Sequence, residues 1–197
     1  MVFLVGCGGL GGWVAEGLAR EKIDFKIADA DVFNASNFNR QLYCTNKTLH
    51  KSKVLVAKER CKSLGQNIEV FEQNITSDNI SLLACAQIVV DCTDNIRTRL
   101  LIEDYCHQNN IILVHGAING YEGQIAISYP NEEKILHSLY AKSEQKTPLE
   151  TSAYATMLVG AMQVNQVVKL LNKPYLALKN EMLIVDTVTD EYAKYKI

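Results

Sequence analysis

The chain has 197 residues, of which 48% are hydrophobic and 21% charged, with a formal net charge of −2. This composition is typical of a globular domain and excludes collagenous, disordered and disulfide-scaffold proteins. Basic and acidic residues are mixed along the chain, so we expect no basic face for nucleic acid. The apolar start lacks a basic leader and is broken by five glycines within its first twelve residues. It predicts neither a signal peptide nor a membrane span, and we expect a cytoplasmic protein that binds no membrane.

Short apolar runs alternate with longer helix-periodic runs over the first part of the chain, a pattern typical of βαβ units with a parallel sheet. In chain order we expect a strand at 2–5, a helix from about residue 10, a strand at 25–28, a long polar connection over 31–48, a helix at 50–64, and then a strand at 68–71, a strand at 87–91, a helix at 95–108 and a strand at 111–114.

The pattern changes after residue 114. Residues 123–129 alternate with period two, which predicts a half-exposed antiparallel strand, and 130–150 is a polar stretch expected to form a mobile surface loop. A long helix over 154–171 and a last strand over 182–185 follow. We therefore predict one α/β domain over residues 1–197, with a Rossmann-like, doubly wound and mostly parallel sheet continued by antiparallel strands.

A glycine-rich turn separates the first strand from the first helix. Gly6, Gly8, Gly9 and Gly11 match the G-x-G-x-x-G pattern, in which the backbone and the helix N-terminus receive a phosphate. Asp29 ends the second strand, where a carboxylate accepts hydrogen bonds from a ribose. A tight turn without ligand and a solvated strand-end aspartate are the alternatives. These two features suit a dehydrogenase and an ATP-using enzyme equally well.

Polar and basic residues after the second strand separate these two possibilities. Asn37 and Arg40 lie in the loop, and Lys53 lies in the following helix, so two cations could reach the glycine turn. A triphosphate carries more negative charge than the pyrophosphate of a dinucleotide and needs more than a helix end to bind it. The added cations therefore favour ATP.

Two carboxylates follow the strand at 87–91. Asp91 and Asp94 stand three residues apart at the carboxyl edge of the predicted sheet, next to Asn95. Beside a polyphosphate they would suit an oxygen-ligated Mg²⁺ ion. The alternative for Asp94 is a helix N-cap, and Arg99 could be either an ion-pair partner or a ligand contact.

Taken together, seven segments resemble the ThiF/MoeB/HesA family, bacterial relatives of the ubiquitin-activating enzymes. They are Gly6-x-Gly8-Gly9-Leu10-Gly11, Asp29-x-Asp31, Ser36-Asn37-x-Asn39-Arg40-Gln41, Lys53, Cys92-Thr93-Asp94-Asn95, Gly116-Ala117 and Tyr121-Glu122-Gly123-Gln124.

The resemblance implies an ATP-dependent adenylyltransferase that acts on the C-terminal glycine carboxylate of a small ubiquitin-like sulfur carrier ending in Gly-Gly, with release of pyrophosphate. It implies that the glycine turn and Asn95 contact the nucleotide and that Asp29 binds the ribose. Asn37, Arg40 and Lys53 would contact phosphates, and Asp94 would coordinate Mg²⁺. Arg40, Lys53 and Asp94 would thereby act in catalysis, by positioning and charge neutralisation. A homodimer is also implied.

The chain also departs from the family pattern. All six cysteines lie within the first 106 residues and no two are spaced C-x-x-C, so we predict neither the zinc site nor the sulfur-relay cysteine of some relatives. The sequence begins at its first strand, where relatives have a helical extension carrying an arginine for the partner subunit. The zinc-free form favours the thiamine branch, with a ThiS-like carrier. The alternatives are a molybdopterin-type (MoeB) enzyme, a tRNA threonylcarbamoyladenosine dehydratase, or an inactive partner-binding subunit.

Overall fold

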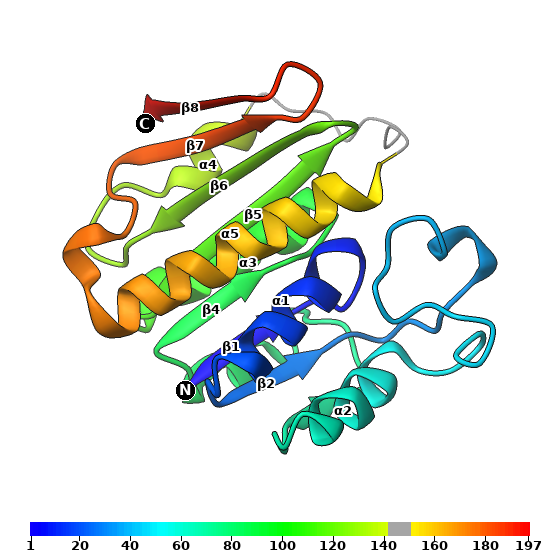
Figure 1. Ribbon diagram of the computed structural model, residues 1–197. Helices are drawn as coiled ribbons and strands as arrows, with labels where there is room; N and C mark the ends of the chain where they lie inside the picture. The colour runs from blue at the N-terminus through cyan, green and yellow to red at the C-terminus, as the bar shows by residue number, and fades with distance from the viewer. Residues whose placement is uncertain (142–150) are drawn as a thin grey trace.

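A mixed sheet of eight strands runs through the computed structural model, which describes residues 1–141 and 151–197 (Figure 1). Its strand order is β3-β2-β1-β4-β5-β6-β7-β8. The first five strands along the chain are parallel, and β6 to β8 continue the sheet antiparallel. The strands are β1 (Val2–Val5), β2 (Phe25–Ala28), β3 (Glu69–Phe71), β4 (Ile88–Asp91), β5 (Ile112–Asn119), β6 (Glu122–Ser128), β7 (Glu181–Asp186) and β8 (Glu191–Lys196). The predicted α/β class and sheet are confirmed.

Helices cover both faces of this sheet, as Figure 1 shows. The five α-helices in the described part of the chain are α1 (Gly9–Arg20), α2 (Lys53–Ser63), α3 (Ile96–Gln108), α4 (Ile135–Tyr140) and α5 (Ala153–Asn172). Apolar side chains of α1, α2 and α5 form one core on one face, and those of α3 and α4 form a second core on the other. Within the described chain, no helix combines the length and the apolar character that a bilayer span requires.

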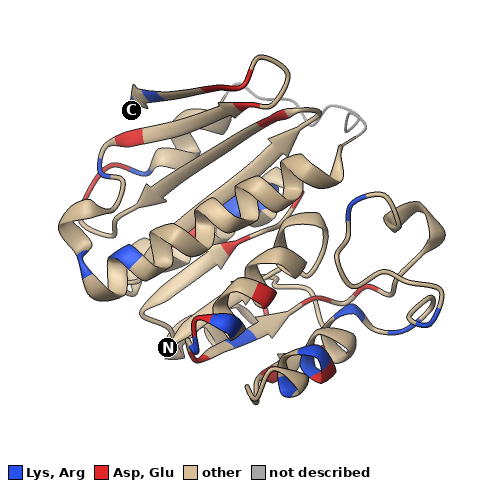
Figure 2. Cartoon of the chain, in the orientation of Figure 1, with Lys and Arg blue, Asp and Glu red and all other residues tan. Residues whose placement is uncertain are grey.

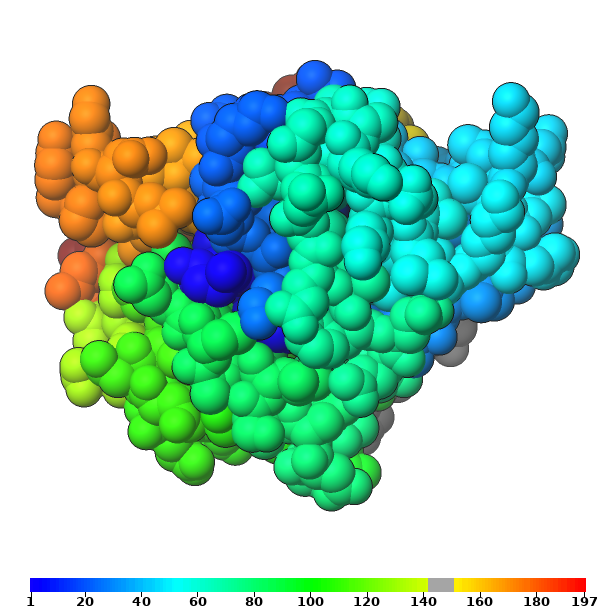
Figure 3. Space-filling view, turned by 90° about the horizontal axis from the view of Figure 1, so that it is seen from below, coloured from blue at the N-terminus to red at the C-terminus, as the bar shows by residue number. Residues whose placement is uncertain are grey.

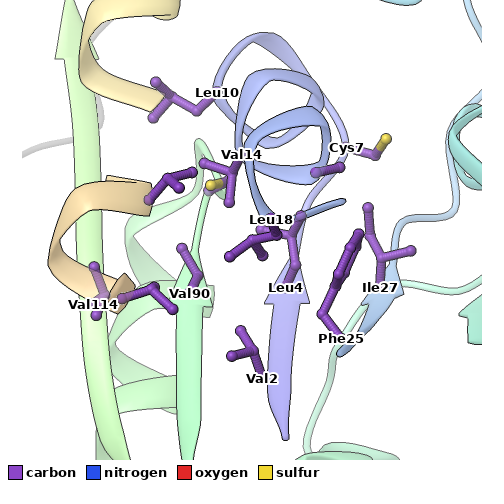
Figure 4. Packing of buried hydrophobic residues seen from close by; sticks show 14 of the residues in the cluster. Val2, Leu4, Cys7, Leu10, Val14, Leu18, Phe25, Ile27, Val90 and Val114 are labelled. Carbon is purple, nitrogen blue, oxygen red and sulfur yellow. The ribbon is translucent and has the colours of Figure 1, made fainter. Parts of the chain in front are cut away.

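The period-two alternation of β1 divides it between these two cores. Val2 and Leu4 belong to the first core, whereas Phe3 and Val5 belong to the second. In Figure 4, Val14 and Leu18 of α1 lie over Leu4 and its neighbouring strands. Each fully buried side chain of this size contributes roughly 1.5–3 kcal/mol. A strand buried on both faces reads as the continuous apolar run from which it was predicted.

The register of the parallel strands brings their carboxyl ends to one edge. Val5, the last residue of β1, is paired with Ala28 of β2 and with Asp91 of β4. The glycine turn, Asp29 and the segment after β4 therefore leave the sheet side by side. In a doubly wound sheet ligands bind at this edge, between the two strands from which the chain turns in opposite directions.

The chain itself covers part of the apolar surface of α5. This helix packs against α1 and against β5 and β6. The contact with α1 is close: a Cβ at Gly17 would come within 2.7 Å of Val164, and one at Gly160 within 2.8 Å of Trp13. Burial within the monomer thus accounts for only part of the apolar character of this helix, because Tyr154, Met157 and Leu171 are exposed (51%, 44% and 43%).

The expected mobile loop over 130–150 is partly wrong, because residues 135–140 form α4. Ile135 and Leu136 are buried, and the carboxylate of Glu103 accepts hydrogen bonds from the backbone N–H groups of Leu136 (2.8 Å) and His137 (3.0 Å). A carboxylate from a distant helix supplies the N-terminal partners that the local sequence lacks. Residues 142–150 of the predicted loop lie outside the described residues.

Two strands extend beyond the sequence prediction. β5 continues to Asn119 and pairs with β6 over seven residue pairs. β8 was missed altogether, because it mixes lysine and glutamate with tyrosine and is exposed along most of its length. It forms an edge of the sheet, where charged side chains are common.

Candidate active site

A cavity of about 760 Å³ opens at the carboxyl edge of β1, β2 and β4. Its lining carries charges of both signs, with Arg40, Lys53 and Arg99 opposite three aspartates. Figure 2 shows the same mixture of signs over the rest of the chain. Of the residues singled out from the sequence, those that line the cavity are Gly6, Gly8, Gly9, Asp29, Arg40, Lys53, Asp94 and Asn95. Gly11 and Asn37 do not line it.

The glycine turn is shaped by backbone contacts that side chains would prevent. Gly6 has a φ of +94°, and a Cβ there would approach the carbonyl oxygen of Cys92 to 2.8 Å. A Cβ at Gly11 would overlap the carbonyl oxygen of Gly6, so this glycine allows the turn and helix to pack together. At Gly8, the N-cap of α1, the nearest atom would be 3.8 Å away. The start of α1 is thus open toward the cavity and directs its N–H dipoles there.

Asp29 joins the glycine turn to the end of β2. Its two carboxylate oxygens accept hydrogen bonds from the backbone N–H groups of Cys7 (2.6 Å) and Asp31 (2.7 Å), and the residue is 9% exposed. Each oxygen of a carboxylate has a second lone pair. Asp29 can therefore hold the turn and still accept hydrogen bonds from a ligand in the cavity.

Lys53 is the first residue of α2, and its ammonium group lies at the cavity. Its Nζ is 2.8 Å from the carboxylate of Asp31, and the Lys53 side chain is 7% exposed whereas that of Asp31 is 65% exposed. The backbone N–H of Lys53 also donates to the carbonyl oxygen of Asp31. A buried ammonium ion beside a single exposed carboxylate retains donors for an anion in the cavity.

Arg40 lies in the connection between β2 and α2, which stands out from one side of the molecule (Figures 1 and 3). Its Nη1 donates to the carbonyl oxygen of Ser36 (2.9 Å) and to Oδ1 of Asn39 (2.8 Å). Thr156 of α5 donates to the Arg40 carbonyl oxygen at 3.2 Å, so α5 supports this connection. The aliphatic part of the Arg40 side chain lies near Gly9, and Arg40 lines the cavity.

Asn37 is placed away from the cavity and shapes the same connection. Its Oδ1 accepts a hydrogen bond from the backbone N–H of Asn34 at 3.0 Å, and the two residues form a reciprocal capping box. The phosphate contact that the resemblance implies for Asn37 has no counterpart in this arrangement.

Asp91 and Asp94 have separate surroundings, so the expected pair of carboxylates around one metal ion is wrong. Asp91 is completely buried, and its oxygens accept hydrogen bonds from the backbone N–H (2.9 Å) and hydroxyl (2.7 Å) of Thr93 and from His115 Nδ1 (2.7 Å). Asp94 is exposed at the cavity, and its carboxylate has no hydrogen-bond partner among the described residues.

Asn95, rather than Asp94, caps α3. Its side chain accepts a hydrogen bond from the backbone N–H of Thr98 at 3.2 Å. The capping role that competed with a ligand role for Asp94 therefore belongs to its neighbour. Asp94 remains available to a ligand.

Burial and hydrogen bonding act in opposite directions on the buried pair. Burial alone would raise the pKa of Asp91, but the hydrogen bond from His115 and the charge of Arg99 hold this pKa below its ordinary value. Burial lowers the pKa of His115, and the hydrogen bond to Asp91 offsets only part of that effect. The pair is thus a carboxylate with a neutral imidazole that donates from Nδ1.

Sequence reasoning missed several residues of the cavity wall. Asn74 and Thr76 follow β3 at the same edge as Asp29, and the rule that ligands bind at strand carboxyl ends could have found them. Thr156 and Ile118 come from α5 and β5, and no local motif marks them. The sequence allows Arg99 to be either an ion-pair partner or a ligand contact. In the structure Arg99 lines the cavity and also donates to the carbonyl oxygen of Thr93 (2.6 Å).

The fold and this cavity together define a Rossmann-like α/β domain with a glycine-lined cavity at the edge of its sheet. A glycine turn ends β1, a carboxylate ends β2, and the cavity lies at the edge where β1 and β4 diverge. The ThiF family model matches residues 1–197, and the chain belongs to that family.

Relatives and solved structures agree with this assignment. The chain is 28% identical to a probable molybdopterin-synthase adenylyltransferase of Porphyra purpurea, over 100% of its own length and 54% of that protein. It is 29% identical to the SAMP-activating enzyme E1 of Haloferax volcanii, over 95% of the chain and 73% of that protein. The chain thus spans about half the length of the first of these relatives.

Among solved structures, that of E. coli MccB with AMPCPP and MccA has the same fold. Its TM-score is 0.82 at 20% identity, covering 99% of this chain and 63% of that one. The crystal structure of PaaA gives a TM-score of 0.80 at 20% identity, covering 100% and 63%.

Proposed function

We propose that the chain catalyses ATP-dependent adenylylation of the C-terminal glycine carboxylate of a small ubiquitin-like carrier protein ending in Gly-Gly, with release of pyrophosphate. The observation that carries this proposal is that the glycine turn, Asp29, Arg40, Lys53 and an Asp94 without a hydrogen-bond partner among the described residues all lie at one cavity. The names of the relatives, adenylyltransferases and an E1-type activating enzyme, support the reaction class.

We assign a part of ATP to each group of the cavity wall. The free lone pairs of Asp29 accept hydrogen bonds from the ribose hydroxyls. The N–H groups at the start of α1 face the phosphates, together with the guanidinium of Arg40 and the ammonium of Lys53. These positively polarised groups stabilise the charge that develops when the carrier carboxylate attacks the α-phosphate and pyrophosphate leaves. No side chain of the protein acts as nucleophile.

Asp94 fits a Mg²⁺ ion shared with the phosphates. Its carboxylate is free at the cavity edge, and an ion of this kind takes most of its ligands from phosphates and water. The described residues contain no group of three His, Cys, Asp or Glu side chains that could hold a metal ion without such help. A bound Mg²⁺ ion would neutralise phosphate charge; Asp94 would hold it on the side of the cavity facing β4.

Our proposal for the biosynthetic pathway depends on the pattern of cysteines in the sequence. We favour a ThiS-like carrier of the thiamine pathway, because the zinc-free form of the chain resembles that branch. A molybdopterin-type carrier is the alternative and has equal support from the relatives named molybdopterin-synthase adenylyltransferases. All six thiols are free, and burial raises the pKa of Cys7 and Cys92 far above its ordinary value, which supports chemistry without a thiolate in the cavity.

Three further elements of the proposal come from the resemblance and the composition. We place the protein in the cytoplasm, a compartment in which free thiols persist. We expect it to act as a homodimer, with neither zinc nor nucleic acid required.

ATP–pyrophosphate exchange tests the proposal. Labelled pyrophosphate should enter ATP only when a carrier ending in Gly-Gly is present, and separate assays with thiamine-type and molybdopterin-type carriers decide the branch. Asp94→Asn should lower the exchange rate by at least tenfold and leave the fold intact, because it removes the charge offered to the cation. Exchange without a carrier contradicts the proposal. Carrier binding without exchange by any carrier would indicate an inactive binding subunit, and ATP-dependent turnover of threonylcarbamoylated tRNA would indicate the dehydratase.

A further inference from the structure

The hydroxyl of Tyr140, at the end of α4, lies at the centre of a hydrogen-bond network beneath the cavity. It is 2.8 Å from Arg99 Nη1, 2.7 Å from Gln124 Nε2 and 3.0 Å from His115 Nε2. These partners come from α3, β6 and β5. The Tyr140 ring also packs edge-on against His115, and the Arg99 guanidinium lies 5.2 Å from the ring centroid. One hydroxyl thus joins α4 to three other elements.

The direction of each hydrogen bond in this network is fixed by its ends. Asp91 is ionised and can only accept, so His115 donates to it from Nδ1. Neutral His115 then offers Nε2 as an acceptor, and the Tyr140 hydroxyl donates to it. Arg99 and Gln124 donate to the Tyr140 oxygen. The Tyr140 hydroxyl therefore accepts hydrogen bonds from Arg99 and Gln124 and donates one to His115.

Both branches of the network end on Thr93, the residue before Asp94. On one branch, Asp91 accepts from the backbone N–H and the hydroxyl of Thr93. On the other, Arg99 donates to the Thr93 carbonyl oxygen from Nε (3.2 Å) and Nη2 (2.6 Å). The backbone that presents Asp94 to the cavity is held on its N–H and its C=O side.

The opposite end of α4 is also anchored, so the position of Tyr140 is determined. Glu103, which is completely buried, accepts from two backbone N–H groups in the first turn of α4 and from the Ser128 hydroxyl (2.7 Å). Leu136 in the same turn is buried in the core. A six-residue helix held at its start carries its last side chain into the network.

We propose that Tyr140 is a positioning residue for Asp94, acting through His115 and Asp91 on one branch and through Arg99 on the other. Its effect on catalysis rests on the proposed function, in which Asp94 holds the cation of the bound nucleotide. Without the hydroxyl, Arg99 Nη1 loses its partner and His115 Nε2 keeps only the longer contact with Gln124 Nε2 (3.3 Å), while the ring contacts remain. The backbone of residues 91–95 then adopts more than one conformation. The Asp94 carboxylate is therefore less often in the position from which it binds the cation.

Tyr140→Phe tests this role, with Tyr129→Phe as the matched control. The Tyr129 hydroxyl also makes a hydrogen bond, to the Leu178 carbonyl oxygen (3.1 Å), and does not line the cavity. In the nucleotide-free protein, hydrogen–deuterium exchange in a peptide spanning 91–95 should be faster in Tyr140→Phe and unchanged in the control. In ATP–pyrophosphate exchange, kcat should fall roughly tenfold and half-saturation should need more Mg²⁺, with the KM for ATP within about twofold of wild type.

A second variant covers the case in which Tyr140→Phe folds poorly. In His115→Asn the amide nitrogen can still donate to Asp91, but nothing remains to accept from Tyr140, so the same changes are expected. Protection of 91–95 equal to that of the control in both variants would overturn the inference, whatever the activity. So would a loss of kcat that the control shares. Wild type inactive with every carrier would refute the proposed function, whereas faster exchange confined to 91–95 would still support the coupling of Tyr140 to this segment.

Discussion

Replacing Asp29 by asparagine tests whether this residue holds the glycine turn. Its two carboxylate oxygens each receive a backbone N–H, at 2.6 and 2.7 Å. Asparagine offers one acceptor oxygen, and its NH₂ group would face the other N–H. One hydrogen bond to a charged acceptor is lost, which costs about 2 kcal/mol at a site that is 9% exposed.

The measurement is urea unfolding, followed by ATP binding to the folded variant. The free energy of unfolding should fall by about 2 kcal/mol, and ATP affinity should fall roughly tenfold because the turn and the ribose acceptor are both disturbed. Asp186→Asn is the matched control. In that turn a single oxygen of Asp186 accepts from Val188 and Thr189, and the amide oxygen of asparagine can keep both bonds. An unfolding free energy of Asp29→Asn within about 0.5 kcal/mol of wild type would refute the reasoning.

Three other substitutions give separate outcomes. Gly11→Ala should lower the unfolding free energy by about 3 kcal/mol in urea melts, because its Cβ overlaps the carbonyl oxygen of Gly6. Lys53→Met should weaken ATP binding at least tenfold by calorimetry. Burial lowers the pKa of His115, so the unfolded chain gains a proton below about pH 6.5 that the folded chain resists. Stability should therefore fall by up to about 2 kcal/mol between pH 6.5 and 5, and less in His115→Asn.

Local patterns were sufficient for the parallel half of the fold. The strands at 2–5, 25–28 and 87–91 are apolar runs bounded by glycine or aspartate, and the structure has them within a residue of the prediction. A buried strand or an amphipathic helix is specified by residues that are close together in the sequence, so its position can be predicted from the sequence alone. α4 and β8 were not visible in this way. α4 depends on a carboxylate from α3, and β8 depends on pairing with β7.

The residues of the candidate site also divide into those that the sequence predicts and those whose role only the tertiary structure decides. Gly6, Gly8 and Asp29 could be predicted because strand ends in a parallel sheet meet at one edge, whatever the details of packing. Nothing in the sequence distinguishes Asp91 from Asp94 in this way, since both are carboxylates after the same strand.

The sequence by itself determined the class of fold, the edge at which a ligand binds and the kind of groups that meet there. Only the tertiary structure decided how each group is used: Asp91 is buried against His115, Asn95 caps α3, and Asp94 remains free at the cavity. The physical reason is that a hydrogen-bond acceptor is committed by whichever donors the fold brings to it. For Asp91 the deciding donor is His115 on β5, which lies 24 residues away along the chain.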